Sequence, residues 1–177
     1  MLIELCQRIT SRAQTPDPLL NSITRNLTHS LVEIACGHCT WIADSKPGSL
    51  AYTGIDLAPL LIEQNRRRFV ERGWKFEVAD VVIEDIPHAD VVLCRDWLDY
   101  LPLVDIGAAL HHMRSAGAKY LIVTNNPSIN TNTETQTGVR RSLNLMQAPF
   151  NMHKPIAVVA QDPQSGTLLA VWQLSTT

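Results

Sequence analysis

Blocks of hydrophobic residues recur along this chain at two different spacings, one typical of strands and the other of helices. Short apolar runs that predict buried strands cover residues 31–36, 51–56, 74–79, 89–94 and 119–124. Helical spacing follows the second run, from Pro59 to a stop at Gly73, and again follows the fourth run, up to Gly117. Strands and helices are therefore expected to alternate.

The pattern changes after the fifth run. Residues 125–154 are rich in Asn, Thr and Ser and show only weak periodicity. Such a segment is too long for an ordinary connector, which predicts a functional insertion on the substrate side of the protein. Two further runs, 156–161 and 168–174, are joined through a turn signal at residues 162–166 and predict a hairpin.

This order predicts an α/β fold with a three-layer, doubly wound sheet of seven strands. Alternating strands and helices give right-handed crossovers and parallel strands, whereas the terminal hairpin must add an antiparallel strand at the edge. Sheets of this kind bind ligands at the carboxyl ends of their strands. Residues 1–30 predict two short helices, broken around residues 15–18, that form an N-terminal cap.

Composition fits one domain, covering residues 1–177, of which 45% are hydrophobic. The formal charge of −2 gives no electrostatic reason to expect nucleic acid or an anionic membrane as partner, and no apolar run has the length of a membrane span. The charge run at residues 66–68 predicts a solvated helix face. The four cysteines lack the density of a disulfide framework, so a reduced, cytoplasmic protein is expected. No pattern predicts an oligomeric state.

Acidic and small residues stand at the ends of the first three predicted strands: Glu33, Gly37, Asp56 and Asp80. A carboxylate that ends the second strand can accept hydrogen bonds from ribose hydroxyls, and a glycine after the first strand lets the backbone approach a ligand closely. Neither G-x-G-x-x-G nor G-x-x-x-x-G-K-[ST] occurs in the chain. These residues therefore indicate a nucleoside ligand without a phosphate chain.

Several ordered motifs resemble those of class I S-adenosylmethionine-dependent methyltransferases, with the Rossmann-like fold of that family. The similarity is closest to a small bacterial subgroup whose first motif reads D-x-G-C-G-D-W-x-W, whose fourth strand ends in L-C-R-D and whose tail carries P-L-N-L and P-P-F-N segments. The corresponding segments here are residues 33–41, 93–96, 142–145 and 148–151. The resemblance covers residues 31 to 174 and implies a methyltransferase that uses S-adenosylmethionine.

The resemblance also implies which residues contact the cofactor. The methionine part would lie along the loop after the first strand, the ribose on Asp56, and the adenine against Leu57 with its amino group on Asp80. His38 either touches the methionine carboxylate or is exposed. The full set of expected cofactor residues is Glu33, Ala35, Gly37, His38, Asp56, Leu57, Asp80, Val81, Cys94 and Arg95.

The chain departs from the family pattern at two positions of the first motif. Ala35 replaces the usual glycine, and Cys39 stands where most of the superfamily has another. The backbone therefore has less conformational freedom and less clearance beside the cofactor.

The residues after the fourth strand are the candidates for catalysis. Methyl transfer from a sulfonium needs alignment, exclusion of water and sometimes a base. Asp96 is the first candidate as base or substrate-orienting group, with helix capping as its alternative role, and Tyr100 is the second, with packing as its alternative. On the acceptor side, Arg140, Arg141 and Asn144 could bind a small hydroxylated or carboxylated molecule such as a sugar, unless the segment is simply a flexible loop.

Three alternatives stay open or are disfavoured at this level. Cys36 and Cys39 have the spacing of a zinc half-site or a redox pair, but no second ligand pair exists and Cys36 is expected to pack within the first strand. A degenerate member of the family could bind the nucleoside weakly or not at all and act as a binding or partner subunit. A Rossmann oxidoreductase is disfavoured because the glycine-rich phosphate turn is absent.

Overall fold

The computed structural model describes residues 29–39, 50–162 and 166–174. Almost all of the predicted N-terminal cap and most of the connection between the first two strands lie outside these residues. Among the described residues, no helix is long and apolar enough to cross a membrane.

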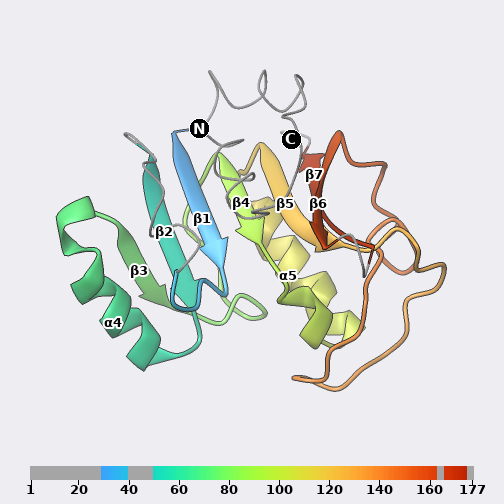
Figure 1. Ribbon diagram of the computed structural model, residues 1–177, viewed down its shortest axis with the longest axis horizontal. Helices are drawn as coiled ribbons and strands as arrows, with labels where there is room; N and C mark the ends of the chain where they lie inside the picture. The colour runs from blue at the N-terminus through green and yellow to red at the C-terminus, as the bar shows by residue number, and fades with distance from the viewer. Residues whose placement is uncertain (1–28, 40–49, 163–165, 175–177) are drawn as a thin grey trace.

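Seven strands form one sheet in the order β3-β2-β1-β4-β5-β7-β6 (Figure 1). The strands β1 to β5 pair in parallel, as the alternation of strands and helices predicts. The hairpin strand β7 pairs antiparallel with β5 on one side and with β6 on the other, so antiparallel pairing is confined to this edge. The bounds are β1 Ser30–Ile34, β2 Ala51–Asp56, β3 Lys75–Val78, β4 Val91–Cys94, β5 Tyr120–Asn125, β6 Ala157–Asp162 and β7 Thr167–Gln173.

Helices pack on both faces of the sheet and complete three layers (Figure 1). On one face lie α4 Pro59–Arg68 and the short 3-10 helix η1 Val70–Arg72, which ends where Gly73 adopts a left-handed φ of 63°. On the other face lie η2 Leu98–Tyr100 and α5 Leu103–Ser115. The predicted α/β fold with a doubly wound, mostly parallel sheet of seven strands is confirmed.

Each face of the central strands belongs to a different core. In β1, Val32 and Ile34 join the core beneath α5, whereas Leu31 joins the core beneath α4. All four residues of β4 are buried, because this strand is central and covered on both sides. Successive side chains of a strand point to opposite faces, so each apolar run fills both cores.

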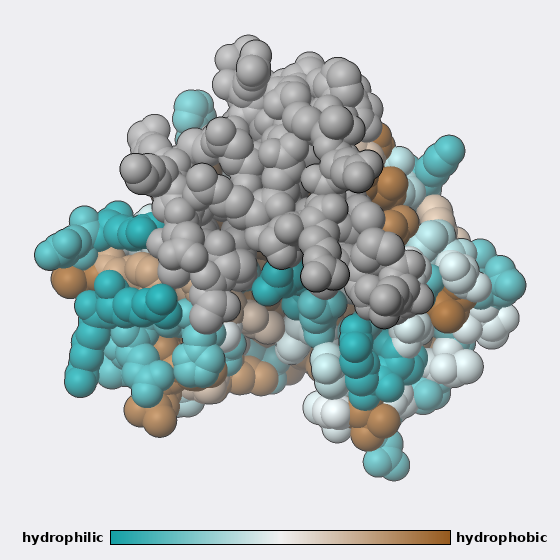
Figure 2. All heavy atoms as spheres, in the orientation of Figure 1, coloured by the Kyte–Doolittle hydropathy of each residue, from teal (hydrophilic) through white to brown (hydrophobic). Residues whose placement is uncertain are grey.

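The charged face of α4 is exposed, as the sequence predicts. Glu63 pairs with Arg67 at 2.9 Å and with Arg66 at 3.9 Å. Figure 2 shows hydrophilic side chains gathered on the left of the molecule, where α4 lies.

Asp90 ties together the beginnings of three strands. Its Oδ2 accepts hydrogen bonds from the backbone N–H groups of His29, at 2.7 Å, and Ser30, at 3.1 Å, and its Oδ1 lies 2.9 Å from Nζ of Lys119. Burial alone would raise the pKa of Asp90, but these hydrogen bonds outweigh burial and lower the pKa to about 2. The carboxylate therefore stabilises the amino ends of β1, β4 and β5.

Residues 126–156 form a long loop without helix or strand beside the β5, β7 and β6 edge (Figure 1). Buried asparagine side chains hold its two arms together. Asn125 Oδ1 accepts from the N–H of Leu145 at 2.7 Å, and Asn132 Oδ1 accepts from the N–H of Asn144 at 2.9 Å. The polar composition of this segment thus stabilises its own conformation.

Candidate functional site

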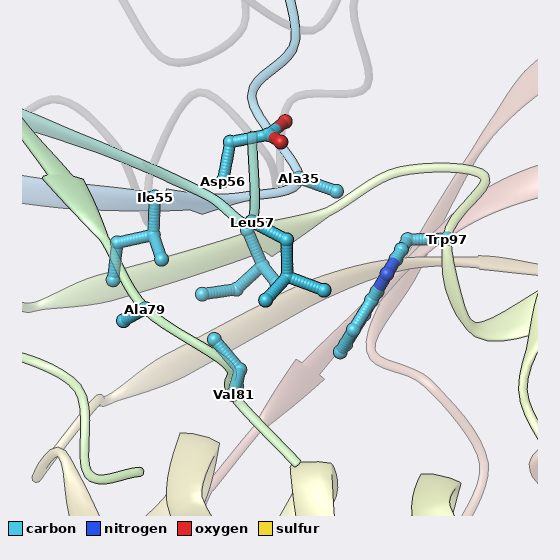
Figure 3. Close-up of a pocket in the computed structure, with 8 residues that line it drawn as sticks. Ala35, Ile55, Asp56, Leu57, Ala79, Val81 and Trp97 are labelled. Atoms are coloured by element: carbon cyan, nitrogen blue, oxygen red, sulfur yellow. The ribbon is translucent and has the colours of Figure 1, made fainter. Parts of the chain in front are cut away.

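A cavity of about 270 Å³ opens at the carboxyl ends of the parallel strands (Figure 3). Its volume is just below the range of about 300–1,000 Å³ that is usual for small-molecule sites. The residues that line it come from the ends of β1 and β2 and from the segments after β3 and β4. They are Ile34, Ala35, Ile55, Asp56, Leu57, Ala79, Val81 and Trp97.

The loop after β1 borders this cavity with an unusual backbone. Ala35, Gly37 and Cys39 all adopt left-handed conformations, with φ of 54°, 53° and 52°. Left-handed backbone favours glycine. Ala35 and Cys39 stand where the family usually has glycine, and both keep the left-handed conformation although they carry side chains. A side-chain carbon at Gly37 would meet no atom of the described part of the chain within 4 Å.

Asp56 joins the ends of β1 and β2. Its Oδ2 accepts a hydrogen bond from the N–H of Gly37 at 3.0 Å, and its Oδ1 accepts one from the N–H of Ala58 at 2.9 Å. Each carboxylate oxygen has a second lone pair that can accept another hydrogen bond. Figure 3 shows this carboxylate set apart from the apolar side chains of the cavity.

The apolar walls of the cavity come from three segments. Leu57 is 55% exposed, whereas Val81 is buried. In Figure 3 the indole of Trp97 faces these two side chains across the open space. Such a slot between an aromatic ring and aliphatic side chains suits a flat heteroaromatic ring.

Trp97 also lines the cavity, and no site role was predicted for it from the sequence. Its position directly after the L-C-R-D segment is the signal that could have identified it. Ile34, Ile55 and Ala79 are further lining residues that the sequence did not single out, because strand residues of this kind are usually core.

Asp80 does not line the cavity. Its Oδ1 accepts a hydrogen bond from the N–H of Val82 at 3.0 Å, and its carbonyl oxygen accepts from Ile83 and Glu84. This turn positions Ala79 and Val81, its two neighbours, in the cavity wall.

Glu33 is buried on the α4 side of the sheet. Its Oε2 accepts a hydrogen bond of 2.5 Å from the hydroxyl of Tyr52, which in turn lies 3.4 Å from Sγ of Cys39. Burial and the nearby Glu33 raise the pKa of Tyr52 well above its ordinary value, so Tyr52 remains the donor. Glu33 therefore supports the loop after β1 from behind.

His38 is exposed at the tip of the same loop, with its carbonyl oxygen 3.2 Å from Nη1 of Arg68. Among the described residues, no group of three or more His, Cys, Asp or Glu side chains could hold a metal ion.

The expected catalytic segment follows β4. Cys94 is fully buried, which raises the pKa of its thiol, and Arg95 lies 3.9 Å from the carboxylate of Asp96. Asp96 has a left-handed φ of 55°, and its N–H donates to the hydroxyl of Thr124 at 2.8 Å. Tyr100 is half-buried in η2.

Asp99 and Arg140 form an ion pair at 3.7 Å in which the Asp99 side chain is 5% exposed and the Arg140 side chain 55%. Burial raises the pKa of Asp99 to about 6, although Arg140 opposes this rise. The sequence identified Arg140 as a candidate, but nothing in the pattern indicated its partner.

Arg141 does not have the free guanidinium that an anion clamp requires. Its nitrogens donate to the carbonyl oxygens of Thr133 at 2.8 Å, Leu101 at 2.8 Å, and Leu98 and Asp99 at 3.3 Å each. Backbone acceptors already use these donors, so a substrate would have to compete with them for the predicted contact.

Asn144, also predicted to bind the substrate, uses its side-chain amide in a similar way. The residue is 1% exposed, and its Nδ2 donates to the carbonyl oxygen of Ile129 at 2.8 Å while its Oδ1 accepts from the N–H of Met146 at 3.1 Å. Arg141 and Asn144 therefore hold the long loop against η2 and β5.

The comparisons with known proteins agree with this geometry. Residues 32–118 match the family model described as a methyltransferase domain. No curated protein matches the chain by sequence.

Solved structures of low identity share the fold. A TehB-like SAM-dependent methyltransferase from Corynebacterium glutamicum ATCC 13032 Kitasato has 15% identity and a TM-score of 0.63, with 89% of this chain and 86% of that chain covered. OxaC, solved in complex with SAH and oxaline, has 16% identity and a TM-score of 0.62, with 97% of this chain and 46% of that chain covered.

CalS10, an amino pentose methyltransferase from Micromonospora echinaspora solved with SAM, has 19% identity and a TM-score of 0.51, with 68% of this chain and 47% of that chain covered. The chain spans about half the length of OxaC and of CalS10. The match to the methyltransferase-domain model and the methyltransferase fold thus coincide on the same strands, and together they support a class I S-adenosylmethionine-dependent methyltransferase with S-adenosylmethionine as its cofactor.

Proposed function

We propose that the protein binds S-adenosylmethionine in the cavity at the carboxyl ends of β1 to β4 and transfers its methyl group to a small polar acceptor, such as a saccharide or another hydroxylated metabolite. The observation that carries this proposal is the combination of an apolar slot with the Asp56 carboxylate beside it. An apolar slot suits the adenine, and a carboxylate suits the ribose hydroxyls.

The adenine would lie between Trp97 and the side chains of Leu57 and Val81, which face one another across the cavity (Figure 3). Burial of the exposed Leu57 side chain by the ligand would add apolar contact. Asp56 would accept from the ribose with its remaining lone pairs while its existing bonds keep the loop in place. The methionine part would extend along Ala35 and Gly37, because the cavity is too small for the whole cofactor.

The methyl group would then point toward the segment after β4. Displacement at a sulfonium needs an aligned nucleophile and a site for the departing proton. Asp96 is held at the end of β4 by Thr124, and its carboxylate is the proposed base or orienting group for the acceptor. Tyr100, in the η2 helix that follows, is the second candidate.

The acceptor would approach from the side of the long loop 126–156. Of the three residues predicted to bind the substrate, Arg140 has an exposed side chain, whereas Arg141 and Asn144 form hydrogen bonds that stabilise the loop. A neighbour described as an amino pentose methyltransferase and another solved in complex with oxaline are compatible with a small acceptor.

A second candidate is a non-catalytic member that binds the nucleoside weakly and serves as a partner subunit. The observation in its favour is the pair Ala35 and Cys39, which place side-chain atoms on a left-handed backbone beside the cofactor loop. The strain that they introduce would be relieved only by a change in the loop.

Calorimetry with S-adenosylmethionine, S-adenosylhomocysteine and NAD distinguishes these functions. We expect the first two to bind and NAD to give no heat. Ala79→Phe, which fills the cavity, should weaken binding at least about tenfold, or about 1.4 kcal/mol. Val78→Phe is the matched control, because Val78 is the neighbouring residue and its side chain is exposed. Equal affinity in both variants would refute the cavity as the site, and no heat with any ligand would favour the second candidate.

A further inference from the structure

The loop after β1 brings Cys36 and Cys39 together in one turn. The strand ends at Ile34, and Cys36 begins this turn, with its N–H donating to the carbonyl oxygen of Ile55 in β2 at 3.0 Å. The N–H of Cys39 donates to the carbonyl oxygen of Cys36 at 3.1 Å. A turn closed in this way brings its first and last Cα atoms within about 7 Å, close to the span of about 4.4–6.8 Å that a disulfide bridges.

The two thiols also share their surroundings. Each Sγ lies 3.9 Å from the carbonyl oxygen of Gly37. Asn65 Nδ2, from α4, lies 3.5 Å from Sγ of Cys39 and 4.0 Å from Sγ of Cys36. Both side chains therefore point to one small region between the turn and α4.

The peptide between these cysteines is the one that Asp56 holds. Gly37 donates its N–H to Asp56 at 3.0 Å and accepts from Asn65 Nδ2 at 2.7 Å through its carbonyl oxygen. A change in the separation of the two sulfurs must be absorbed where the turn can move. Among the described residues, no atom lies within 4 Å of the position of a side-chain carbon at Gly37, whereas Cys36 and Cys39 are buried.

We propose that Cys36 and Cys39 form an intramolecular disulfide on mild oxidation, and that this bond weakens the binding of S-adenosylmethionine by displacing the Gly37 peptide from Asp56. The coupling to the cofactor rests on the proposed function, whereas the disulfide itself does not. A disulfide at this position makes the first-motif loop a redox-sensitive element.

The reaction balances with a peroxide as the oxidant. The Cys39 thiolate attacks one peroxide oxygen and becomes a sulfenic acid, and the other oxygen leaves as hydroxide, which takes up a proton to give water. The Cys36 thiol then attacks the sulfenic sulfur, the S–S bond forms and a second water leaves. The two cysteines together lose two electrons, and hydrogen peroxide gains them.

The cysteines differ in a way that suits this order of steps. The neighbouring Cys36 thiol lowers the pKa of the Cys39 thiol, and the Cys39 thiol together with burial raises the pKa of Cys36. The thiolate is the attacking form, so Cys39 is the first thiol to react. Burial of both thiols predicts slow oxidation.

The disulfide must also alter contacts beyond the turn. Its S–S bond of about 2.05 Å is much shorter than a thiol hydrogen bond, and the bonded sulfurs have no S–H to donate. The contact of Cys39 with the Tyr52 hydroxyl, which donates to Glu33, would change as well. The buried network behind the loop would then be rearranged together with Gly37.

The test compares reduced and peroxide-treated protein. After blocking of free thiols, peptide mapping should show a Cys36–Cys39 link in the treated protein and a mass lower by two hydrogen atoms. Calorimetry should show at least about tenfold weaker S-adenosylmethionine binding, which dithiothreitol reverses. By linkage, saturating cofactor should raise the reduction potential of the cysteine pair by about 30 mV, so that the pair is harder to oxidise.

Cys36→Ser and Cys39→Ser should each bind S-adenosylmethionine with the same affinity before and after peroxide treatment. Each variant is compared with itself, so any direct effect of the serine on affinity cancels in the ratio of treated to untreated protein. Cys6→Ser, outside the described residues, is the control that should keep the full response. Absence of the link in the folded protein overturns the proposed site, and a link with unchanged affinity overturns the coupling.

Failure of the proposed function gives a different result. If the reduced protein does not bind S-adenosylmethionine, the link is still read from the peptide map, and the loop is read by hydrogen exchange of residues 31–39. Faster exchange at Gly37 in the oxidised protein supports the displacement of its N–H from Asp56, and unchanged exchange contradicts it.

Discussion

Replacement of Asp90 by asparagine tests how the sheet is tied together at its amino end. The Asp90 carboxylate accepts from two backbone N–H groups and lies 2.9 Å from Nζ of Lys119. The asparagine side chain would keep the size of the aspartate, but it would lose the charge and would present N–H groups toward donors. The variant therefore removes the electrostatic part of this junction with little change in packing.

The magnitude follows from the pKa. Asp90 has an ordinary pKa of 3.8 and a folded-state pKa of about 2. One pKa unit corresponds to about 1.36 kcal/mol, so the ionised carboxylate contributes about 2 kcal/mol to the free energy of unfolding. Because the folded-state pKa is lowered, this contribution is complete above pH 3.8 and is lost as the pH falls toward about 2.

Urea unfolding at pH 7 and pH 3 measures the effect. We expect Asp90→Asn to lower the free energy of unfolding by about 2 kcal/mol at pH 7 and by about 1 kcal/mol at pH 3. Asp85→Asn is the matched control, since the Asp85 side chain is 86% exposed and should change stability by less than about 0.5 kcal/mol. An equal loss at the two pH values, or a loss at pH 7 as small as that of the control, would refute the reasoning.

Substitutions at Gly54, Ala35 and Asp99 test the packing and electrostatics around the site. Gly54→Ala should cost about 1–3 kcal/mol in urea unfolding, because the new carbon would lie 2.9 Å from Sγ of Cys36 and 2.9 Å from Phe76. Gly107→Ala should not destabilise the protein, because no atom of the described residues lies within 4 Å of the new carbon. Equal stability of the two variants would contradict this packing. Ala35→Val should cost about 2 kcal/mol of stability and Ala35→Gly less than about 0.5 kcal/mol, because a branched side chain fits the left-handed φ of 54° poorly. Thermal unfolding in which the valine variant is the more stable of the two would argue against this backbone conformation. Asp99→Asn should raise the free energy of unfolding more at pH 8 than at pH 4. The pKa of Asp99 rises from 3.8 to about 6 on folding, so ionisation of this side chain opposes folding as the pH rises through this range. Denaturation curves with no such pH-dependent gain would exclude this burial effect.

Most of the fold could be predicted because periodicity reports burial directly. The run at residues 51–56 matches β2, and the other strands differ from their predicted bounds by at most two residues at each end. The end of β1 is the instructive difference. Ala35 reads as a continuation of the apolar run, but its left-handed φ ends the strand, and a backbone angle of this kind leaves no trace in hydrophobicity.

The site was predictable where the family motif and the strand ends coincide. Ala35, Asp56, Leu57 and Val81 were all expected near the cofactor, and all four line one cavity. Asp80 and Glu33 support this cavity through hydrogen bonds without lining it, which composition alone does not distinguish.

The long polar loop was the least predictable part. Arg141 and Asn144 have the donors that a substrate site needs, but the same donors satisfy backbone carbonyls in a segment without helix or strand. A loop of this length must pair its buried polar groups internally, and side-chain amides are suited to that task. Sequence alone does not show whether such a group faces a ligand or the backbone.

A crystal structure with S-adenosylhomocysteine would show directly where the cofactor binds. We expect the adenine between Trp97 and Leu57, with a ribose hydroxyl within hydrogen-bonding distance of Asp56 and the homocysteine part along Ala35 and Gly37. Binding at another surface, or an empty cavity in crystals soaked with the ligand at saturating concentration, would contradict this placement.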